Sequence, residues 1–250
     1  MIFIKRSLWT GQKWLFFLVG SLFLSGNFPL EIPDASDSNW EQMLRHCLQE
    51  ERTVHHTILD TNPEMCRPLA IVAPELIRYS LFRDYFETSA LEALYIQYGT
   101  DGADFSIGKF QMKPSFVEQL EKAILDDKAL LSKYHAIVCN TGDLNMDRRK
   151  RLDLLKKPES QLLYAKACWD VLEKAYPAEN FANMEEQVHF FASAYNLGFY
   201  KSEAEITAFQ KQKAFPFGPL SPDEQTAFGD LAVYAYLTLK TGESNSVSMN

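Results

Sequence analysis

The fold is decided by a helical segment that ends in Phe190-Phe191-Ala192-Ser193-Ala194-Tyr195-Asn196-Leu197-Gly198. Asn183 with Glu186 forms a cap at its start, because a short polar side chain there accepts a hydrogen bond from an otherwise unpaired backbone N–H group. Gly198 suits its end, since glycine adopts the left-handed conformation without a Cβ clash. These start and stop signals predict one helix over 183–198.

Helical patterns fill most of the rest of the chain. Apolar side chains recur at helical spacing after Ser38 and within 67–80 and 84–98. Ser115 with Glu118 has the form of a capping box, in which a hydroxyl and a carboxylate satisfy each other's backbone N–H groups. This pair predicts the start of a further helix.

Two later helices also have clear start signals. Pro158 suits the first turn of a helix that continues through Tyr176. The segment Ser221-Pro222-Asp223-Glu224 opens a last helix that ends near Lys240. Turn-forming residues leave room for at most a small turn or hairpin near 99–107. We therefore predict a mainly α protein.

The first 26 residues have the pattern of an export signal. Three cations precede an apolar run of eleven residues, Trp14 to Leu24, and no acidic residue occurs in 1–26. Eleven residues are too few to span a bilayer comfortably. We expect an exported protein of the periplasm or cell envelope, with a signal peptide or uncleaved N-terminal anchor over 1–26, a linker over 27–37, one helical domain over 38–242 and a flexible tail over 243–250. An uncleaved N-terminal segment is the one membrane contact we expect.

Composition narrows the classes of partner and cofactor. The net charge of -8 argues against nucleic acid, because neutralising phosphates needs an excess of Lys and Arg. A hydrophobic fraction of 46% is typical of a globular protein. No Cys/His spacing typical of zinc occurs, and we expect no metal or other cofactor. Four cysteines permit two disulfides in an exported protein or remain as buried thiols; they are Cys47, Cys66, Cys139 and Cys168.

Three stretches carry side chains suited to chemistry. The first is Leu69-Ala70-Ile71-Val72-Ala73-Pro74-Glu75-Leu76-Ile77, in which one acid, Glu75, follows a proline that kinks or restarts the helix. The second is Ser106-Ile107-Gly108-Lys109-Phe110-Gln111-Met112, in which Gly108 lets the backbone approach a ligand and Gln111 offers an amide donor and acceptor. The third is the helix end with Tyr195 and Asn196.

In this order the three stretches resemble the lysozyme-like lytic transglycosylases, which cleave peptidoglycan. That family carries one catalytic glutamate, then a Gly-Leu-Met-Gln type turn, then an Ala-Tyr-Asn-x-Gly helix end. Here Lys109-Phe110 stands for the Leu-Met pair, and Leu76 follows Glu75 where the family usually has serine. The resemblance covers residues 67–200.

The resemblance implies a lysozyme-like helical domain that cleaves the glycan strand of peptidoglycan with a single glutamate. Glu75 would protonate the scissile oxygen and then deprotonate the attacking hydroxyl, which requires burial that raises the pKa of a carboxyl group. Gly108, Gln111, Tyr195 and Asn196 would bind the substrate. The product would be a 1,6-anhydro sugar, or a reducing end if water attacks.

Spacing leaves other interpretations open. Glu75 precedes Gly108 by 33 residues, which is longer than the family spacing, whereas Glu87 and Glu92 precede it by 21 and 16. An inserted helix over 81–98 would reconcile Glu75 with the family; otherwise Glu87 or Glu92 is the acid. The altered motifs also fit a catalytically inactive lysozyme-like protein that binds glycan or an envelope partner. The sequence does not indicate an oligomeric state.

Two patterns are interpreted as structural. The segment Asp143-Leu144-Asn145-Met146-Asp147 begins like a calcium loop, but Arg148 occupies the position that needs glycine. The basic run Arg148-Arg149-Lys150-Arg151 is interpreted as the solvated start of a helix.

Overall fold

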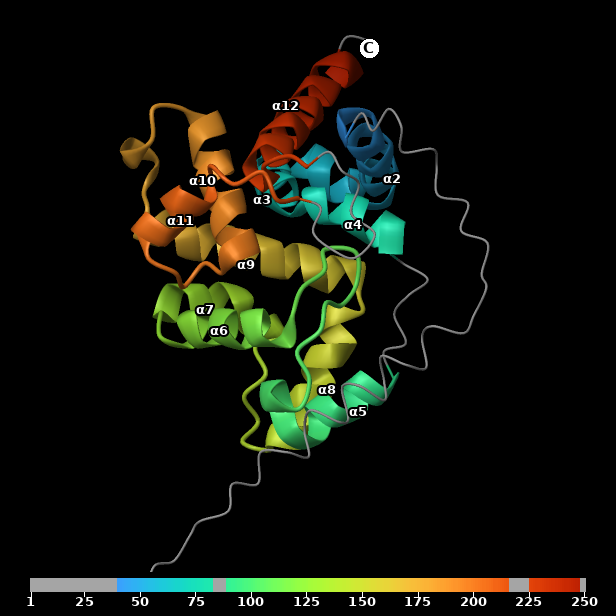
Figure 1. Cartoon of the computed structure of the whole chain (residues 1–250), viewed down its shortest axis with the longest axis vertical. Coiled ribbons are helices and arrows are strands. Elements are labelled where there is room, and N and C mark those ends of the chain that lie inside the picture. The colour runs from blue at the N-terminus through green and yellow to red at the C-terminus, as the bar shows by residue number, and fades with distance from the viewer. Residues whose placement is uncertain (1–39, 83–88, 216–224, 248–250) are drawn as a thin grey trace, which may run out of the picture. The chain divides into compact units, whose positions relative to one another are not determined.

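A computed structural model describes residues 40–82, 89–215 and 225–247 (Figure 1). These residues form eleven α-helices and no strand, so the prediction of a mainly α protein is confirmed. No helix within these three ranges is long and apolar enough to cross a membrane. The predicted leader and linker over 1–37, and the start signal at 221–224, lie outside the described residues.

Figure 1 labels the helices of the described residues in chain order. They are α2 (Trp40–Thr61), α3 (Cys66–Val72), α4 (Pro74–Phe82), α5 (Ser89–Tyr98), α6 (Pro114–Leu125), α7 (Lys128–Tyr134), α8 (Leu144–Leu155), α9 (Pro158–Ala175), α10 (Met184–Leu197), α11 (Glu203–Phe209) and α12 (Phe228–Val247).

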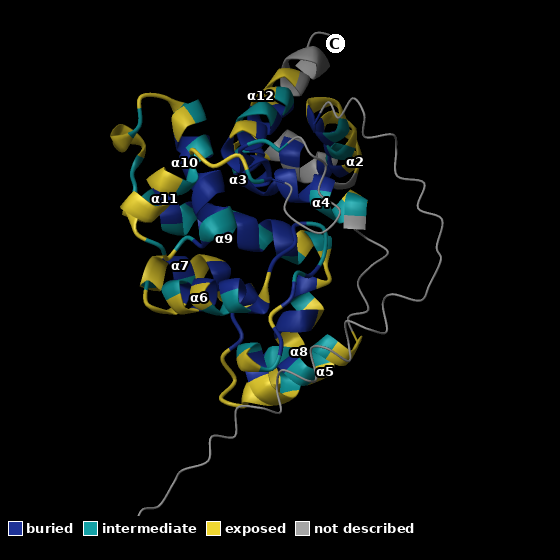
Figure 2. Cartoon of the chain, in the orientation of Figure 1, coloured by how far each residue is buried: buried dark blue, intermediate teal, exposed yellow. Residues whose placement is uncertain are grey.

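Helix α3 forms the centre of the core (Figure 2). Its run of Pro68 to Val72 is completely apolar, and each of these side chains is buried. A helix that is apolar on all sides needs neighbours on all sides. Helices α9, α10 and α12 pack against α3 and supply them.

Pro74 divides the second apolar run into two helices. Helix α3 ends at Val72, Ala73 connects, and α4 begins with Pro74 itself. Proline fits the first position of a helix because the missing N–H group has no partner there in any case. The predicted restart at Pro74 is confirmed, and it places Glu75 in the first turn of α4.

Both predicted ends of α10 are confirmed. The Asn183 side chain accepts a hydrogen bond from the backbone N–H group of Glu186 at 2.8 Å, and the Glu186 carboxylate accepts one from the N–H group of Ala182 at 2.6 Å. Gly198 follows the last helical residue with a φ of 117°. Pro158 likewise begins α9, and the N–H group of Tyr176 donates to the carbonyl of Leu172.

The predicted capping box at Ser115 is wrong. Helix α6 begins one residue earlier, at Pro114. The backbone N–H group and hydroxyl of Ser115 donate to the two carboxylate oxygens of Asp104, at 3.0 and 2.7 Å. Glu118 instead accepts a hydrogen bond from the hydroxyl of Tyr95 at 2.7 Å. A carboxylate before the helix thus replaces the cap that the local sequence suggested.

The last helix also ends later than predicted. It continues past Lys240 to Val247. The hydroxyl of Thr241 donates to the carbonyl of Leu237 at 3.0 Å, as serine and threonine do inside a helix. The single glycine at position 242 does not stop the helix, because an isolated glycine costs only about 1 kcal/mol there.

The predicted turn near 99–107 is present, and a hairpin-like bridge follows it. Gly99–Asp101 forms one 3₁₀ turn. A single antiparallel bridge joins Ile107 and Met112, with N–H to carbonyl distances of 3.0 and 3.1 Å. The hairpin-like feature therefore coincides with the second sequence motif, and we call residues 107–112 the motif turn.

The interpretation of the basic run as a solvated face is wrong for Arg151. Its guanidinium is buried and donates to the carboxylate of Glu121 at 3.0 and 2.7 Å and to the hydroxyl of Tyr95 at 2.5 Å. This group connects α8 to α6 and α5. The acids of the calcium-like segment are structural as expected, since Asp143 caps α8 and Asp147 accepts from Thr141.

No disulfide joins the four cysteines, all of which lie within the described ranges. Cys66, Cys139 and Cys168 are buried, and Cys47 is partly exposed. Of the two alternatives, disulfides or thiols, the structure shows thiols.

Candidate active site

The Glu75 carboxyl group is the centre of the candidate site. Its side chain is buried, with 3% of the residue exposed. Asn196, near the end of α10, donates from Nδ2 to Oε1 of Glu75 at 3.3 Å. Arg78, one turn later on α4, donates from Nη1 to both oxygens, at 3.2 and 3.1 Å. The fold thus brings two of the sequence motifs into contact across 121 positions of the chain.

Burial changes the acidity of Glu75. It raises the pKa from 4.5 to about 7, although Arg78, Asn196 and Lys113 all act to lower it. The raising effect is larger because the ionised carboxylate loses its hydration in the protein interior. Near neutral pH the carboxyl group is therefore present in both protonation states, as a group that must first donate and then accept a proton requires.

Tyr195 connects α10 to the motif turn. Its hydroxyl donates to the carbonyl of Phe110 at 2.6 Å, and its ring packs edge-on against Phe116 at 5.1 Å. Burial, with the charge of Glu75 as a second cause, raises the pKa of the Tyr195 hydroxyl well above its usual value. Tyr195 therefore remains a hydrogen-bond donor and holds the turn against the helix.

Gln111 has an uncommon backbone conformation and an unpaired side-chain acceptor. It adopts a φ of 50°, which is uncommon for a residue with a side chain. Its Nε2 donates to the carbonyl of Gly108 at 2.9 Å, while its Oε1 is buried and has no hydrogen-bond partner among the described residues. An unpaired buried acceptor costs about 1–3 kcal/mol. Residues held in uncommon backbone conformations concentrate at functional sites.

Gly108 has a structural reason to be glycine. The resemblance assigned it to substrate binding, but a Cβ on Gly108 would lie 1.9 Å from Nε2 of Gln161. Gln161 is buried; its Nε2 donates to the carbonyl groups of Ile107 and Leu155, and its Oε1 accepts from the N–H group of Phe110. The Gln161 side chain fills the space on the Cβ side of Gly108. Gln161 supports the motif turn, and sequence reasoning missed it because only the fold brings it there.

Lys109 anchors the motif turn to α2. Its ammonium forms an ion pair with the Glu51 carboxylate, which is buried. The other oxygen of Glu51 lies 3.4 Å from Nε2 of His55, without hydrogen-bond alignment. Burial acts to raise the pKa of Glu51, but His55 and Lys109 together lower it below the ordinary value. The lysine that departs from the family motif thus has a specific partner.

Of the two alternative acids, the structure describes Glu92. Glu92, on α5, pairs with Nζ of Lys156 at 2.8 Å. Glu87 lies outside the described residues. Of the two candidate acids that the structure describes, Glu75 is the one that contacts Asn196. Helix α5 follows Glu75 and precedes the motif turn, so a helix does lie within the long spacing between them.

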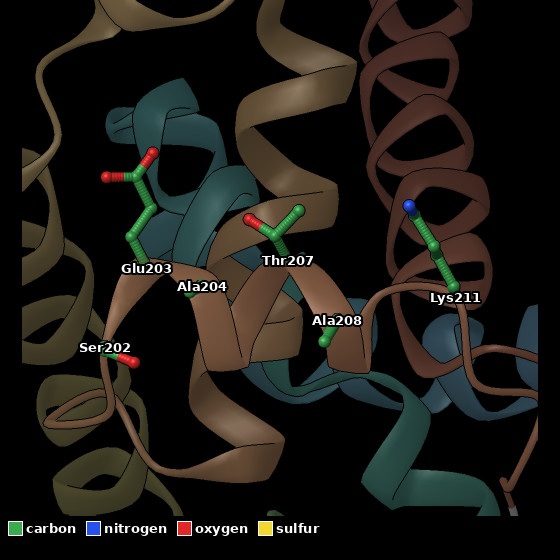
Figure 3. A pocket seen from close by; sticks show the side chains of 6 residues that line it. All are labelled: Ser202, Glu203, Ala204, Thr207, Ala208 and Lys211. Carbon is green, nitrogen blue, oxygen red and sulfur yellow. The ribbon is translucent and has the colours of Figure 1, made fainter.

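A shallow depression lies elsewhere, on α11 and its flanks (Figure 3). Glu203 and Lys211 lie on opposite sides in Figure 3, and the other lining residues are short: Ser202, Ala204, Thr207 and Ala208. None of the residues around Glu75 lines it. Among the described residues, no group of three or more His, Cys, Asp or Glu side chains gathers in a way that could hold a metal ion.

Comparison of this chain with protein-family models, with curated proteins and with solved structures finds no match.

Proposed function

We propose that the protein is a peptidoglycan-cleaving glycosidase of the lytic transglycosylase type, with Glu75 as its single acid–base group. The observation that carries this proposal is the environment of Glu75. The carboxyl group is buried, bound by Asn196 and has a pKa of about 7. The proposal includes export to the periplasm or cell envelope, where this substrate lies.

Cleavage of the glycosidic bond requires Glu75 to donate one proton and then to accept another. Protonated Glu75 donates to the glycosidic oxygen as the bond to the sugar carbon breaks. The resulting carboxylate then removes the proton from the attacking hydroxyl. If that hydroxyl is the 6-OH of the same sugar, the product is a 1,6-anhydro sugar; if it is water, the product is a reducing end. Asn196 holds the carboxyl group through Oε1 during both steps.

Gln111 suits substrate recognition. Its unpaired Oε1 is an acceptor that an N–H group of a ligand could satisfy. N-acetyl sugars carry such an N–H group. Binding of the glycan would then remove the cost of the unpaired carbonyl group, and this gain favours substrates with an N-acetyl amide.

A second candidate is a catalytically inactive lysozyme-like protein that binds glycan or an envelope partner. The observation that favours it is the ion pair of Glu75 with Arg78, whose Nη1 contacts both carboxylate oxygens. A guanidinium in that position stabilises the ionised form, which cannot donate a proton.

Digestion of purified peptidoglycan sacculi separates the two candidates. Released fragments are analysed by mass spectrometry for 1,6-anhydro and reducing ends. We expect release by the wild type, loss of about 100-fold or more for Glu75→Gln, and near-normal release for the matched control Glu92→Gln. Cosedimentation with sacculi without release of any fragment would favour the binding protein. Full activity of Glu75→Gln would show that another residue is the catalytic acid.

A further inference from the structure

Arg78 has hydrogen-bonding capacity that Glu75 does not use. Only Nη1 contacts the carboxylate. Within the described ranges, Nε and Nη2 of this guanidinium have no hydrogen-bond partner, and the side chain is 25% exposed. Its central carbon lies 5.8 Å from the centre of the Phe215 ring, which supports one face of the group. Among the described residues, the guanidinium is therefore held through Nη1, and its Nε and Nη2 donors are open.

The surroundings of Glu75 are locally positive in an acidic protein. Lys113 acts on Glu75 as a second cation, in addition to Arg78. Both positive charges act on one carboxyl group, whereas the whole chain carries a net charge of -8. A local excess of positive charge beside a candidate cleavage site favours an anionic group on the substrate.

We propose that Arg78 binds a carboxylate carried by the glycan, so that the substrate is a strand whose sugars have free carboxylate groups. This inference rests on the proposed function and specifies its substrate class. The planar guanidinium matches a carboxylate with two parallel hydrogen bonds, and Nε with Nη2 forms such a pair of donors. In peptidoglycan the lactyl group ends in a free carboxylate only after its peptide has been removed. A reaction that hydrolyses that amide bond must therefore supply the substrate.

The arrangement also connects substrate binding to the acid. A substrate carboxylate on the free edge of Arg78 shares its positive charge with Glu75. The ionised form of Glu75 then loses part of its stabilisation, and its pKa rises. Binding of the anionic strand thus favours the protonated acid that cleavage needs, which removes the objection that the ion pair raises against catalysis.

Binding measurements test the inference without relying on cleavage. The probes are soluble glycan strands freed of peptide, and the same strands with their carboxylates converted to methylamides. Calorimetry with the full chain should show about tenfold tighter binding of the carboxylate form, as expected for a charge-assisted pair. Arg78→Gln should abolish this preference, and Arg78→Lys, which keeps the charge without the planar pair of donors, should keep part of it. Arg149→Gln, at an exposed position on α8, is the matched control.

Equal affinity of the wild type for both strands would overturn the inference, and so would a preference that survives in Arg78→Gln. The comparison within the wild type needs no variant, so it stands even if a variant folds poorly. Cleavage measured in parallel distinguishes the two proposals. A carboxylate preference without cleavage would refute the catalytic proposal alone, whereas cleavage without a preference would refute the substrate class alone.

Discussion

Replacement of Glu75 by glutamine should change how stability depends on pH. The folded protein binds a proton at Glu75 more tightly than the unfolded chain does, because the pKa is about 7 in the folded state and 4.5 ordinarily. This contribution to the free energy of unfolding is fully present below pH 4.5 and is lost as the pH rises towards 7. The glutamine variant has no such group.

The magnitude follows from the two pKa values. The difference between about 7 and 4.5, at about 1.36 kcal/mol for each pH unit, gives about 3 kcal/mol. Between pH 4.5 and pH 7, the wild type should therefore lose about 3 kcal/mol of unfolding free energy relative to Glu75→Gln. Other buried acids, such as Glu51 and Asp170, occur in both proteins, so their contributions cancel in the comparison.

Urea unfolding at four pH values from 4.5 to 8, followed by circular dichroism, measures this difference. Glu92→Gln is the matched control, since Glu92 pairs with a half-exposed lysine, and its difference from the wild type should change little with pH. If the difference between the wild type and Glu75→Gln stays within about 0.5 kcal/mol over the whole range, Glu75 does not titrate near neutral pH. The acid–base role proposed for it would then lose its physical basis.

Two further substitutions test the motif turn by urea unfolding. Gly108→Ala should destabilise the protein by about 3 kcal/mol, because the new methyl group overlaps Gln161 and the backbone has a φ of 68°. Gly142→Ala, with a φ of 90° and no atom within 4 Å, should cost only about 1 kcal/mol, and equal costs at the two positions would contradict the role of Gln161. Tyr195→Phe should cost about 1–3 kcal/mol, because it leaves the buried carbonyl of Phe110 unpaired; a neutral effect would show that the hydroxyl does not hold the turn.

Local signals were enough for the helices and several of their ends. The helical fold, the restart at Pro74 and the two ends of α10 depend on interactions within a few residues, and periodicity and capping patterns record such interactions directly. The predicted capping box at Ser115 shows the limit. Asp104, from outside the helix, accepts the hydrogen bond of the Ser115 N–H group that the capping box would have used. The local sequence at the helix start does not indicate this contact.

The candidate site was predicted in part. The resemblance named Glu75 and Asn196 together, and the structure places them in contact. The pairing of Glu75 with Arg78 had a visible signal that was missed, since residues three apart on a helix are neighbours. The contact of Gln161 with the motif turn had no local sequence signal. Gln161 lies 51 positions from Phe110, and only tertiary packing brings the two residues together.

Arg151 illustrates a different difficulty. A run of four cations predicts a solvated surface, because burying an unpaired charge is costly. Glu121 is 30 positions away in sequence but pairs with Arg151 through two hydrogen bonds. Burial of a charge thus depends on a partner whose position no local pattern reveals.

Because Lys109 and Glu51 form an ion pair, the effect of a substitution at either position depends on the residue at the other. Exchange of Lys109 for an apolar residue would leave a buried acid without its cationic partner, and exchange of Glu51 would leave the lysine without its anchor. Either mutation alone should be strongly destabilising, whereas a paired replacement by two apolar side chains removes both charges together. Natural variants of this chain should therefore alter both positions together, and an engineer who converts the motif turn to its more usual sequence must redesign α2 in the same step.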